Sequence, residues 1–569
     1  MGSDRSELNM SPTYRILGVS AVASVVLQRY APQYSLGLIG TFIFLLLTIF
    51  IARQLWYVTI YPAFLSPLRH LPTAPDGQFI LGHTREVLSA DSGMPMRKWS
   101  ETVPNDGLIK YSMWGSDRLL LTNPKVLGEV LVTKNYDFVK PYHFRSALGR
   151  ILGVGLLLAE GDEHKLQRKN LMPAFAFRHI KELYPVFWDK SREMVECLSV
   201  ASKSSERTIE KLDPKKPLDP ERGQTEHAPG VIEVGNWTSR ATLDIIGLAG
   251  MDHDFNALKD PNNKLSQTYR NLFNPSKSAR YLQVAGIFLP FWFLRRIPID
   301  RNNELDTAAN FVKSVCRDII SAKRQLLSEK KERTHVDIVS VALDSGGFTD
   351  EELVNQMMTF LIAGHETTAT AMIWGVYLLC KHPEKQQKLR EAIRASLPSL
   401  NDTVTAADID GCAYLHATCQ EILRLWSPVS MTIRIAAHDT SINDVVVPKD
   451  TTVILAPWAV NTSANLWGPD SLEFKPERWL DADGRANNKG GADSNFSFLT
   501  FLHGPRGCIG QKFAQAEFEC LIGAWFGRYE TRFEEGSPLK EDGDVKVKGG
   551  ITMKPKAGLW VELKELEGW

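Results

Sequence analysis

The longest apolar stretch of the chain lies near its N-terminus. From Tyr30 to Ala52 there are 23 residues without a charge, most of them in the run LGLIGTFIFLLLTIFIA. At about 1.5 Å per residue, 23 helical residues span roughly 34 Å, enough to cross the hydrocarbon core of a bilayer. Arg53, Trp56 and Tyr57 follow, as basic and aromatic residues do at a membrane interface. The pattern therefore predicts a transmembrane helix.

A shorter apolar segment, residues 16–28, precedes this one, and Arg29 separates the two. The pattern does not decide whether the shorter segment also spans. A cleaved signal peptide and a buried core helix are the alternatives for the longer segment. A signal peptide has a shorter apolar region that is followed by small residues, whereas Arg53 follows here. We therefore expect residues 1–60 to be a retained membrane anchor, with its helix at about residues 34–56.

The stretch SPLRHLPTAPDG after the anchor contains Pro67, Pro72 and Pro75. Proline lacks a backbone N–H and fixes φ, so the interior of a helix is excluded there. Residues 61–80 are therefore predicted to be a stiff, extended hinge that holds a soluble body close to the membrane.

The body, residues 81–569, is patterned mainly for helices. The clearest helix is Thr349–Lys381, because TDEE fits a capping box and no proline occurs before residue 383. It is apolar on most faces and is expected to run through the core. Polar residues predict solvated loops at Ala201–Gly230 and Asp481–Ser494. Strands are predicted at Leu119–Thr122, Val445–Pro448, Thr452–Leu455 and Gly558–Val561. The expected fold class is mainly α with small β-sheets (α+β).

Composition excludes several classes of protein without indicating a function. Lys plus Arg and Asp plus Glu are each 66, so the formal net charge is zero, and 44% of the residues are apolar. These globular values exclude a wholly disordered chain, and the balanced charge gives no indication of a nucleic-acid partner. The seven cysteines form no CxxC pair, which favours a reducing compartment over a disulfide framework. At about 150 residues per domain, length alone suggests three or four domains.

The densest cluster of special residues is FLHGPRGCIG, residues 501–510, which precedes an amphipathic helical run. Cys508 lies where this glycine-rich loop enters the helix, so the positive helix end and free N–H groups are expected to favour its thiolate. Gly507 and Gly510 allow amide N–H groups to approach the sulfur, and Arg506 is placed to meet an anion. Most single cysteines are inert core residues, but these surroundings favour a functional thiolate.

The spacing FxxGxRxCxG resembles the haem-thiolate signature of the cytochrome P-450 family. The resemblance covers nearly the whole chain and implies the cytochrome P-450 fold, with residues 81–569 as a single haem-binding catalytic domain in place of several. It implies that Cys508 is the axial ligand of the iron of haem b. It also implies that Phe501, Arg506 and Gly510 lie against the cofactor.

Two further motifs of this family precede the cysteine loop. EILR, residues 421–424, resembles the family's ExxR motif, in which the two charged residues share one helix face. PERW, residues 476–479, resembles its PERF segment. The resemblance implies a buried ion network of Glu421, Arg424 and Arg478, whose role is more positional than stabilising.

The long helix contains AGHETT, residues 363–368, which is similar to the family's oxygen-activation groove. The resemblance implies that Gly364 lets O2 approach the backbone, and that Glu366 and Thr367 form a catalytic acid–alcohol relay for protons. The alternative for Thr367 is the ordinary bond of a helical threonine to the carbonyl four residues earlier.

GDEHKLQR, residues 161–168, resembles the family's WxxxR segment, with His164 where tryptophan is usual. Histidine can also donate a hydrogen bond. The resemblance implies haem-propionate contacts from His164, Arg168, Arg434 and Arg506, because a guanidinium fork matches a carboxylate.

The same resemblance implies an apolar substrate pocket, for which ordinary core packing is the alternative at each position. The expected pocket residues are Phe144, Leu157, Phe360, Ala363, Gly364, Val429, Met431 and Ile551.

The function implied is monooxygenation, the insertion of one atom of O2 into a lipophilic small molecule by hydroxylation or epoxidation. The likeness is to microsomal members from filamentous fungi, which implies a terpenoid or polyketide intermediate of secondary metabolism. A fatty-acid or xenobiotic hydroxylase is the alternative. Electrons are expected from NADPH through NADPH-cytochrome P-450 reductase, with cytochrome b5 as a further candidate partner. The expected location is the endoplasmic reticulum membrane, with the catalytic domain on the cytosolic side.

Three other interpretations stay open at this point. A family member that rearranges peroxides often departs from the acid–threonine pair, which this chain keeps. A non-catalytic haem sensor or carrier on the membrane predicts no substrate-dependent use of reductant. A membrane-tethered structural protein without haem predicts no haem-thiolate spectrum.

Overall fold

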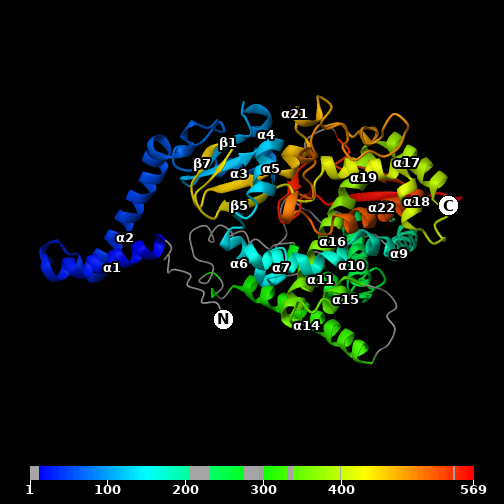
Figure 1. Ribbon diagram of the computed structural model, residues 1–569, viewed down its shortest axis with the longest axis horizontal. Coiled ribbons are helices and arrows are strands. Elements are labelled where there is room, and N and C mark those ends of the chain that lie inside the picture. The colour runs from blue at the N-terminus through cyan, green and yellow to red at the C-terminus, as the bar shows by residue number, and fades with distance from the viewer. Residues whose placement is uncertain are drawn as a thin grey trace.

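The computed structural model describes residues 12–203, 230–273, 294, 296–297, 299–329, 337–397, 399–541 and 545–569. In Figure 1, helices α1 (Pro12–Tyr30) and α2 (Gly37–Leu55) project away from the rest of the chain. They join the body on the side where the strands gather, and most of the helices fill the other side. Residues 204–229 of the predicted loop at 201–230 lie outside the described residues.

The structure begins with short elements that lead into the first sheet. They are η1 (Pro32–Tyr34), η2 (Trp56–Leu65), η3 (Pro67–His70), α3 (Thr84–Ser89), α4 (Met94–Thr102), β1 (Leu108–Met113), β2 (Ser116–Leu121), α5 (Pro124–Gly128), η4 (Glu129–Thr133) and β3 (Phe138–Val139). The helical part follows, with α6 (Tyr142–Leu152), α7 (Gly161–Leu171), η5 (Met172–Phe175), α8 (Phe177–Glu182), α9 (Tyr184–Ser202), β4 (Ile232–Glu233), α10 (Val234–Met251), α11 (Lys264–Phe273), α14 (Asp300–Ser328), α15 (Ile338–Asp344), α16 (Asp350–Lys381), α17 (Pro383–Ser396), α18 (Ala406–Gly411) and α19 (Ala413–Leu425). The last third contains β5 (Thr432–Ala436), β6 (Thr440–Ile442), β7 (Val445–Val447), β8 (Thr452–Leu455), α20 (Pro457–Asn461), α21 (Ala464–Trp467), η6 (Pro476–Trp479), η7 (Asn495–Ser497), η8 (Gly504–Arg506), α22 (Gln511–Arg528), β9 (Tyr529–Phe533), β10 (Val547–Lys548), β11 (Lys554–Pro555) and β12 (Trp560–Glu565).

The sheets join early and late parts of the chain. The largest has five strands in the order β1-β2-β8-β5-β3. β2 pairs in parallel with β8, with Leu119 opposite Val453, so residues 118–121 and 452–455 lie side by side. A three-stranded sheet, β4-β12-β9, and the ribbons β6-β7 and β10-β11 are the other sheets of the described residues.

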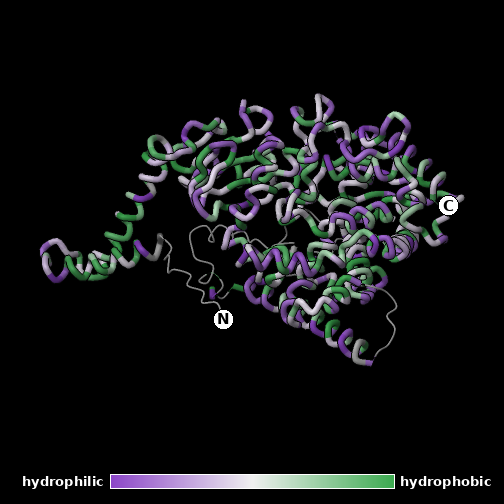
Figure 2. Tube along the Cα trace, in the orientation of Figure 1, coloured by the Kyte–Doolittle hydropathy of each residue, from purple (hydrophilic) through white to green (hydrophobic). Residues whose placement is uncertain are grey.

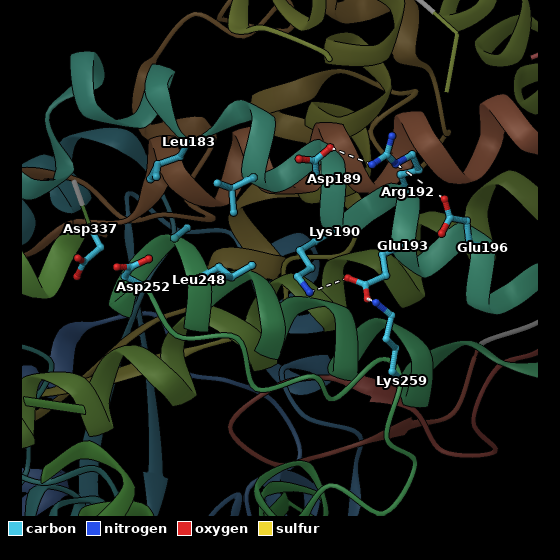
Figure 3. A pocket seen from close by; sticks show the side chains of 12 residues that line it. Leu183, Asp189, Lys190, Arg192, Glu193, Glu196, Leu248, Asp252, Lys259 and Asp337 are labelled. Carbon is cyan, nitrogen blue, oxygen red and sulfur yellow. Dashed lines mark hydrogen bonds and ion pairs between the residues drawn. The ribbon is translucent and has the colours of Figure 1, made fainter. Parts of the chain in front are cut away.

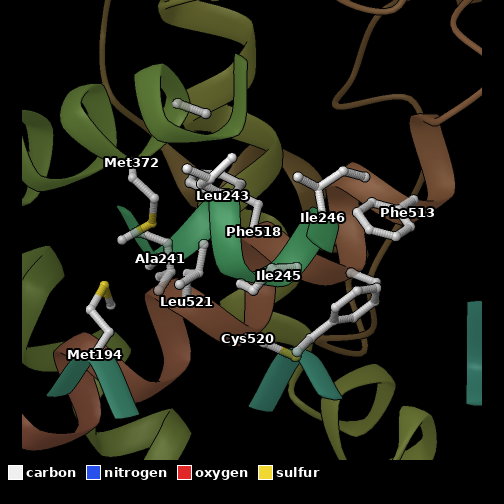
Figure 4. Packing of buried hydrophobic residues seen from close by; sticks show 14 of the residues in the cluster. Met194, Ala241, Leu243, Ile245, Ile246, Met372, Phe513, Phe518, Cys520 and Leu521 are labelled. Atoms are coloured by element: carbon white, nitrogen blue, oxygen red, sulfur yellow. The ribbon is translucent and has the colours of Figure 1, made fainter. Parts of the chain in front are cut away.

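Helix α16 runs through the helical core and packs against α10, α14 and α22. Figure 4 shows apolar side chains of α10, α16 and α22 meeting there, among them Leu243, Met372 and Phe518. The predicted capping box closes the N-terminus of α16, since Thr349 and Glu352 each accept a hydrogen bond from the other's backbone N–H. Contacts on nearly every face explain why the apolar residues of α16 are not confined to one stripe.

The structure confirms the long helix predicted at residues 349–381, which is α16. The strand predicted at residues 452–455 is β8, and those predicted at 119–122 and 445–448 correspond to β2 and β7 with slightly different ends. The strand predicted at 558–561 begins two residues later, as β12.

The N-terminal apolar segment is helical, with different ends from those predicted. The helix α2 begins at Gly37 and continues into η2, which has π-helical turns and contains Pro62. The departure from α geometry fits a proline that cannot supply the N–H of an i→i−4 bond. Among the described residues, 37–62 is a segment long and apolar enough to cross a membrane by length and composition.

The predicted hinge, residues 61–80, also contacts the first sheet. Leu68 is 1% exposed, and Thr73 forms a bridge with Lys110 of β1. The Ala74 N–H donates to the Lys110 carbonyl at 2.8 Å. The prolines do prevent a long helix, but apolar residues and free backbone groups between them bind the first sheet.

Glu517 on α22 places a carboxyl group inside the apolar core. Its residue is 0% exposed, and in the described part of the chain neither carboxyl oxygen has a hydrogen bond of normal geometry. Burial raises the pKa of Glu517 well above its usual value, and the Thr368 hydroxyl opposes the rise only in part. The folded protein therefore holds Glu517 protonated at a pH where the unfolded chain would ionise it.

We expect Glu517→Gln to stabilise the protein at neutral pH. The folded-state pKa is raised, so the wild type loses stability as pH rises above the unfolded-state value, and the glutamine variant escapes this loss. The two proteins should melt alike at acidic pH, and the variant about 2 °C or more higher at neutral pH. Glu519→Gln on the same helix is the control, because Glu519 has a partner, His416 Nδ1, at 2.7 Å. If the melting temperature of Glu517→Gln does not rise further above that of the wild type as the pH increases, this account is contradicted.

Candidate active site

The cysteine loop runs from the turn η8 into α22. The Cys508 N–H donates to the Phe501 carbonyl at 2.8 Å, which folds the loop back on itself. Gly504 has a φ of +73°, and a Cβ added there would lie 2.1 Å from the Leu131 carbonyl oxygen. Leu502 also has a left-handed φ, 54°. The surrounding structure thus holds this loop in a tight conformation that requires glycine at position 504.

The Cys508 thiol is exposed, yet it lies deep enough in the protein that burial raises its pKa. Both observations fit a thiol that faces an internal space. The Gly510 N–H and the charge of Arg168 lower this pKa without outweighing burial. In the chain without a bound metal, desolvation thus outweighs the effect of the helix end on the Cys508 thiol, and a bound metal cation would reverse that balance. The thiolate ligand stays a prediction. The Gly510 N–H is an amide that approaches the sulfur, whereas the Gly507 N–H donates to the Gly504 carbonyl at 3.0 Å.

The three residues predicted for a buried ion network come together. Arg424 Nε and Nη2 each donate to a different carboxylate oxygen of Glu421, both at 2.8 Å. Arg478 Nε donates to Glu421 Oε1 at 2.9 Å. Trp479 Nε1 donates to the second oxygen at 2.9 Å, a contact that the motifs did not indicate. Glu421 and Arg424 are 0% exposed, so the hydrogen bonds replace the water that both charges lost.

Asn461 ties this network to the start of the cysteine loop. Arg424 Nη1 donates to the Asn461 carbonyl at 2.8 Å. The Asn461 side chain donates to Thr500 Oγ1 and accepts from the Leu499 N–H, both at 2.7 Å. Thr500 in turn donates to the Leu423 carbonyl at 2.8 Å. Sequence reasoning missed Asn461, because a single asparagine carries no motif.

Buried cations gather around Glu160. Arg506 forms an ion pair with Glu160 and donates to the Phe138 carbonyl at 2.7 Å, and Lys140 Nζ lies 3.5 Å from Glu160. Burial, then the charge of Arg506, lowers the pKa of Arg434 to about 10. Burial, then Arg434, lowers the pKa of Lys140 to about 7. In this cluster three cations share one carboxylate. The excess positive charge is buried, so further anions bound there would stabilise the cluster.

His164 and Arg168 of α7 lie beside this cluster. The His164 Nδ1 is 3.2 Å from the Tyr136 hydroxyl. Burial, then the charge of Arg506, lowers the pKa of His164 to about 4, so its ring is neutral at physiological pH. Arg168 Nη1 donates to the Gly507 carbonyl at 2.7 Å and thus holds the cysteine loop.

These residues fit a haem. Arg506 Nε is buried without a hydrogen-bond partner among the described residues. Two propionate carboxylates would occupy such donors and neutralise the excess positive charge around Glu160. Cys508, two residues after Arg506, presents an accessible thiol in the interior. Lys140 and Tyr136 complete this arrangement and were not identified from the sequence, since their segment resembled no motif.

Helix α16 has an accessible face at one place. Residues 356–362 and 368–380 are buried, whereas Ala363 is exposed and Gly364 and Thr367 are partly exposed. Residues i and i+4 share a helix face, so these three border one space inside the protein. The Thr367 hydroxyl donates to the Ala363 carbonyl at 2.7 Å, the bond expected of any helical threonine.

Gly364 has a packing role that the sequence did not indicate. A Cβ added there would lie 2.8 Å from Cγ1 of Ile246 on α10, so glycine lets the two helices approach. Its role in admitting O2 stays a prediction.

The Glu366 carboxylate binds the C-terminal part of the chain. Its Oε1 accepts a hydrogen bond from Thr552 Oγ1 and pairs with Lys554 Nζ, both at 2.8 Å. Met553 between them is anchored, since its carbonyl accepts from Trp374 Nε1 at 2.7 Å. Among the described residues, Glu366 and Thr367 thus bind different partners and not each other. Sequence reasoning missed Thr552 and Lys554 as partners, because no local pattern links them to α16.

The predicted pocket segments meet in two pairs. The loop after α6 lies against α16, where the Leu156 N–H donates to Gln356 at 2.9 Å. The turn before β11 lies against the segment after α19, where the Met553 N–H donates to the Pro428 carbonyl at 2.9 Å. Phe360 is buried and packs on Phe175, with ring centroids 5.7 Å apart. Of the other predicted pocket residues, Phe144, Leu157, Ala363 and Ile551 are exposed, and Gly364, Val429 and Met431 are partly exposed.

A separate hollow of about 390 Å³ lies between α9 and α10 (Figure 3), and none of the predicted site residues line it. Several of its charged side chains pair with one another. Glu193 is 2.6 Å from both Lys190 and Lys259, and Arg192 is 3.4 Å from Asp189. The hollow is therefore distinct from the cysteine loop and the cation cluster.

Comparison with known proteins shows a similarity that covers most of the chain. A family model described as Cytochrome P-450 matches residues 106–560. The chain is 41% identical over 572 residues to the cytochrome P-450 monooxygenase sphH of Aspergillus fumigatus, covering 98% of this chain and 100% of the relative. It is 40% identical over 563 residues to the cytochrome P-450 monooxygenase ALT8 of Alternaria alternata, covering 90% and 93%. It is 37% identical over 535 residues to the cytochrome P-450 monooxygenase FSL4 of Gibberella zeae, covering 91% and 92%. The chain belongs to the cytochrome P-450 family and is an oxidoreductase that incorporates oxygen.

Proposed function

We propose that this protein is a membrane-anchored monooxygenase that hydroxylates or epoxidises a lipophilic small molecule. Family membership implies a haem with cysteine-thiolate ligation, and Cys508 is the proposed ligand. The observation that carries the proposal is the accessible Cys508 thiol in the interior, two residues from the buried, incompletely bonded Arg506. Bound haem supplies the activation of O2, and the protein supplies position, protons and the shape of the pocket.

The cation cluster supports a specific orientation of the cofactor. Arg434, Arg506 and Lys140 are the proposed partners of the haem propionates, because they share the single carboxylate of Glu160. Arg168 and neutral His164 hold the adjoining cysteine loop and Tyr136. Phe501 and Gly510 are the proposed cofactor contacts on the cysteine side of the ring.

The relay proposed for Glu366 and Thr367 needs one further step. Glu366 pairs with Lys554, whose side chain is 29% exposed, and Lys554 is therefore the proposed donor of protons to the buried carboxylate. Thr367 borders the interior space at Ala363. A proton can pass between them through a water molecule or after rotation of the Glu366 side chain.

We expect the Thr367→Ala variant to keep the haem and the fold but to be uncoupled, so that it consumes NADPH without forming a matching amount of product. The hydroxyl is partly exposed to the interior and bonds only locally, so its removal costs little stability. Loss of a positioned proton donor should lower coupling about tenfold or more and raise release of hydrogen peroxide. The measurement is the ratio of peroxide formed to NADPH consumed.

Thr370→Ala is the matched control for this experiment. Thr370 lies on the same helix and bonds the carbonyl of Glu366, four residues earlier, at 2.8 Å, but it is 0% exposed. A threonine that acts only through its intrahelical bond would give the same result at both positions. Full coupling in Thr367→Ala, or equal uncoupling in Thr370→Ala, would count against the relay.

Residues 1–60 are proposed as the anchor, 61–80 as the connection, and 81–569 as one catalytic domain on the cytosolic face of the endoplasmic reticulum. The exposed apolar surface of α2 supports the anchor, with Leu38, Ile39, Phe44 and Ile51 each at least 48% exposed. The proposed electron donor is NADPH-cytochrome P-450 reductase, with cytochrome b5 as a further candidate.

The proposed substrates are terpenoid or polyketide intermediates of secondary metabolism, supported by the likeness to fungal relatives. The test incubates microsomes that contain this protein and the reductase with a panel of terpenoids, polyketides and fatty acids under isotopically heavy O2. One heavy oxygen atom in an NADPH-dependent product is expected. Labelled fatty acids alone would support the alternative hydroxylase. Reductant use that no substrate changes would instead favour a haem sensor or carrier.

A further inference from the structure

The helix α1 has its polar and apolar sides reversed relative to a helix of a water-soluble protein. It packs mainly against α2, and the side chains buried there are polar, with Ser20 and Ser24 at 0% and 1% exposed. Its outward side chains are apolar: Val19, Val22 and Val25 are 57%, 65% and 55% exposed. Such an arrangement is unfavourable in water, where apolar faces are buried and polar ones solvated.

The contact between the two helices resembles packing inside a bilayer. Small residues and hydroxyl groups join helices in lipid, where apolar surface gives no driving force for association. Ser24 satisfies its hydroxyl within α1, donating to the Ala21 carbonyl at 3.0 Å. Thr41 of α2 is 3% exposed and lies 3.1 Å from the Ser35 hydroxyl in the connection. The hydroxyls are thus turned inward, away from the surroundings.

Basic and aromatic residues flank the apolar parts of both helices. Arg29 lies over the Tyr30 ring at 5.9 Å at the end of α1, and Arg53 lies over the Tyr57 ring at 5.1 Å after α2. Such pairs suit the headgroup region. Figure 2 shows α1 and α2 standing clear of the body, with hydrophobic stretches along both.

From these contacts we infer that α1 is immersed in the hydrocarbon of the bilayer together with α2, and that acyl chains cover its valine face. The inference rests on the proposed anchoring by α2 and deepens it: the anchor is a pair of helices. Continuity with α2 and the absence of polar side chains on the exposed face of residues 17–26 select lipid over water as the neighbour of α1.

The helix α1 does not cross the membrane. Its uncharged part, residues 16–28, has 13 residues and spans roughly 20 Å, less than the ~30 Å of a hydrocarbon core. Arg15 and Arg29 at its two ends therefore reach the headgroups of the same leaflet. Both ends of α1 then lie on the membrane face opposite to the catalytic domain.

A cysteine-accessibility experiment on the haem-loaded full chain tests the immersion. Val22→Cys marks the proposed lipid face, and Tyr34→Cys, in the connection between the helices and 75% exposed, is the matched control. Both are placed in vesicles of phosphatidylcholine and phosphatidylserine with a charged maleimide on both sides, and the unchanged protein corrects for native cysteines. Val22→Cys should react at least about tenfold more slowly than Tyr34→Cys, and equally after denaturation. Equal rates in vesicles would overturn the inference.

A second measurement separates lipid from protein as the cover. For this measurement, the Val22→Cys protein is labelled with a fluorophore in denaturant and then refolded into vesicles. The fluorophore at position 22 should be quenched by lipids that carry a nitroxide on the acyl chain. Protection from maleimide without quenching would mean that protein covers α1, which overturns the inference. Retention of the protein in the vesicle pellet after carbonate extraction tests anchoring by α2 separately. Failure of the proposed anchor can therefore be distinguished from failure of the placement of α1.

An N-glycosylation acceptor in a polar extension before residue 1 tests the topology. If α1 stays in one leaflet and α2 crosses, the acceptor faces the lumen and is glycosylated in microsomes. An acceptor that stays unmodified while the catalytic domain is cytosolic would show that α1 crosses, which overturns the one-leaflet placement.

Discussion

Replacing Cys508 by alanine is expected to abolish turnover while leaving the fold in place. Cys508 is proposed to bind the haem iron, and no other described residue presents a thiol from the cysteine loop. Activity should fall by at least about 10³-fold, equivalent to ~4 kcal/mol of barrier. The thiol itself contributes little to packing, because it is exposed to the interior space. The reduced, carbon monoxide-bound spectrum should lose the band typical of thiolate ligation, while circular dichroism stays unchanged.

Cys520→Ala is the matched control, since it makes the same change on the helix that follows the loop. Cys520 is 0% exposed and packs in the apolar core (Figure 4), so its truncation should cost about 1 kcal/mol of stability and leave the spectrum intact. A thiolate-type spectrum that survives in Cys508→Ala would refute the ligand assignment. A well-folded wild type without that spectrum would refute haem-thiolate chemistry altogether.

Arg424→Met is expected to be the most destabilising single substitution of the buried ion network. It removes two hydrogen bonds from Glu421, which is 0% exposed, and one from the Asn461 carbonyl that leads to the cysteine loop. Breaking one side of a buried pair typically costs 3–5 kcal/mol, so a loss of about 4 kcal/mol is expected. Denaturant unfolding and haem content of the purified protein measure the two consequences.

Lys165→Met provides the matched control, because Lys165 and Asp162 also pair at i and i+3, at 2.7 Å, but on the surface. Its effect should stay within about 0.5 kcal/mol. Combining Arg424→Met with Glu421→Leu should not recover the lost stability, because Glu421 keeps Arg478 and Trp479 as partners in the single variant and the double variant loses these contacts too. Haem content should stay low in the double variant, since Asn461 and the loop have still lost the guanidinium. Normal haem content in both variants would show that the network does not position the cysteine loop.

The parts of the fold that local sequence encodes were predictable. The capping box at Thr349 and the uninterrupted apolar run after it define α16 within one turn. The ExxR pair was predictable because residues three apart share a helix face, and the structure places Glu421 and Arg424 in contact. The exposed apolar residues of α2 likewise follow from an unbroken uncharged run.

Contacts between distant segments were not predictable in the same way. Asn461, Lys140 and Lys554 carry no motif, and each acquires its role only because another segment folds beside it. The effect of burial on the metal-free Cys508 thiol was not predictable for a related reason. The helix end is a local feature, but the desolvation that raises the pKa comes from the whole surrounding body.

The sequence by itself determined the family, the long apolar segment near the N-terminus and the identity of the chemical groups, because spacing within a loop or a helix turn is a local property. Only the tertiary structure decided what those groups face. It showed that Glu366 binds Lys554 and Thr552, that excess cations surround Glu160, and that the serines of α1 point inward. Burial and charge depend on all the neighbours of an atom, and those neighbours come from segments hundreds of residues apart.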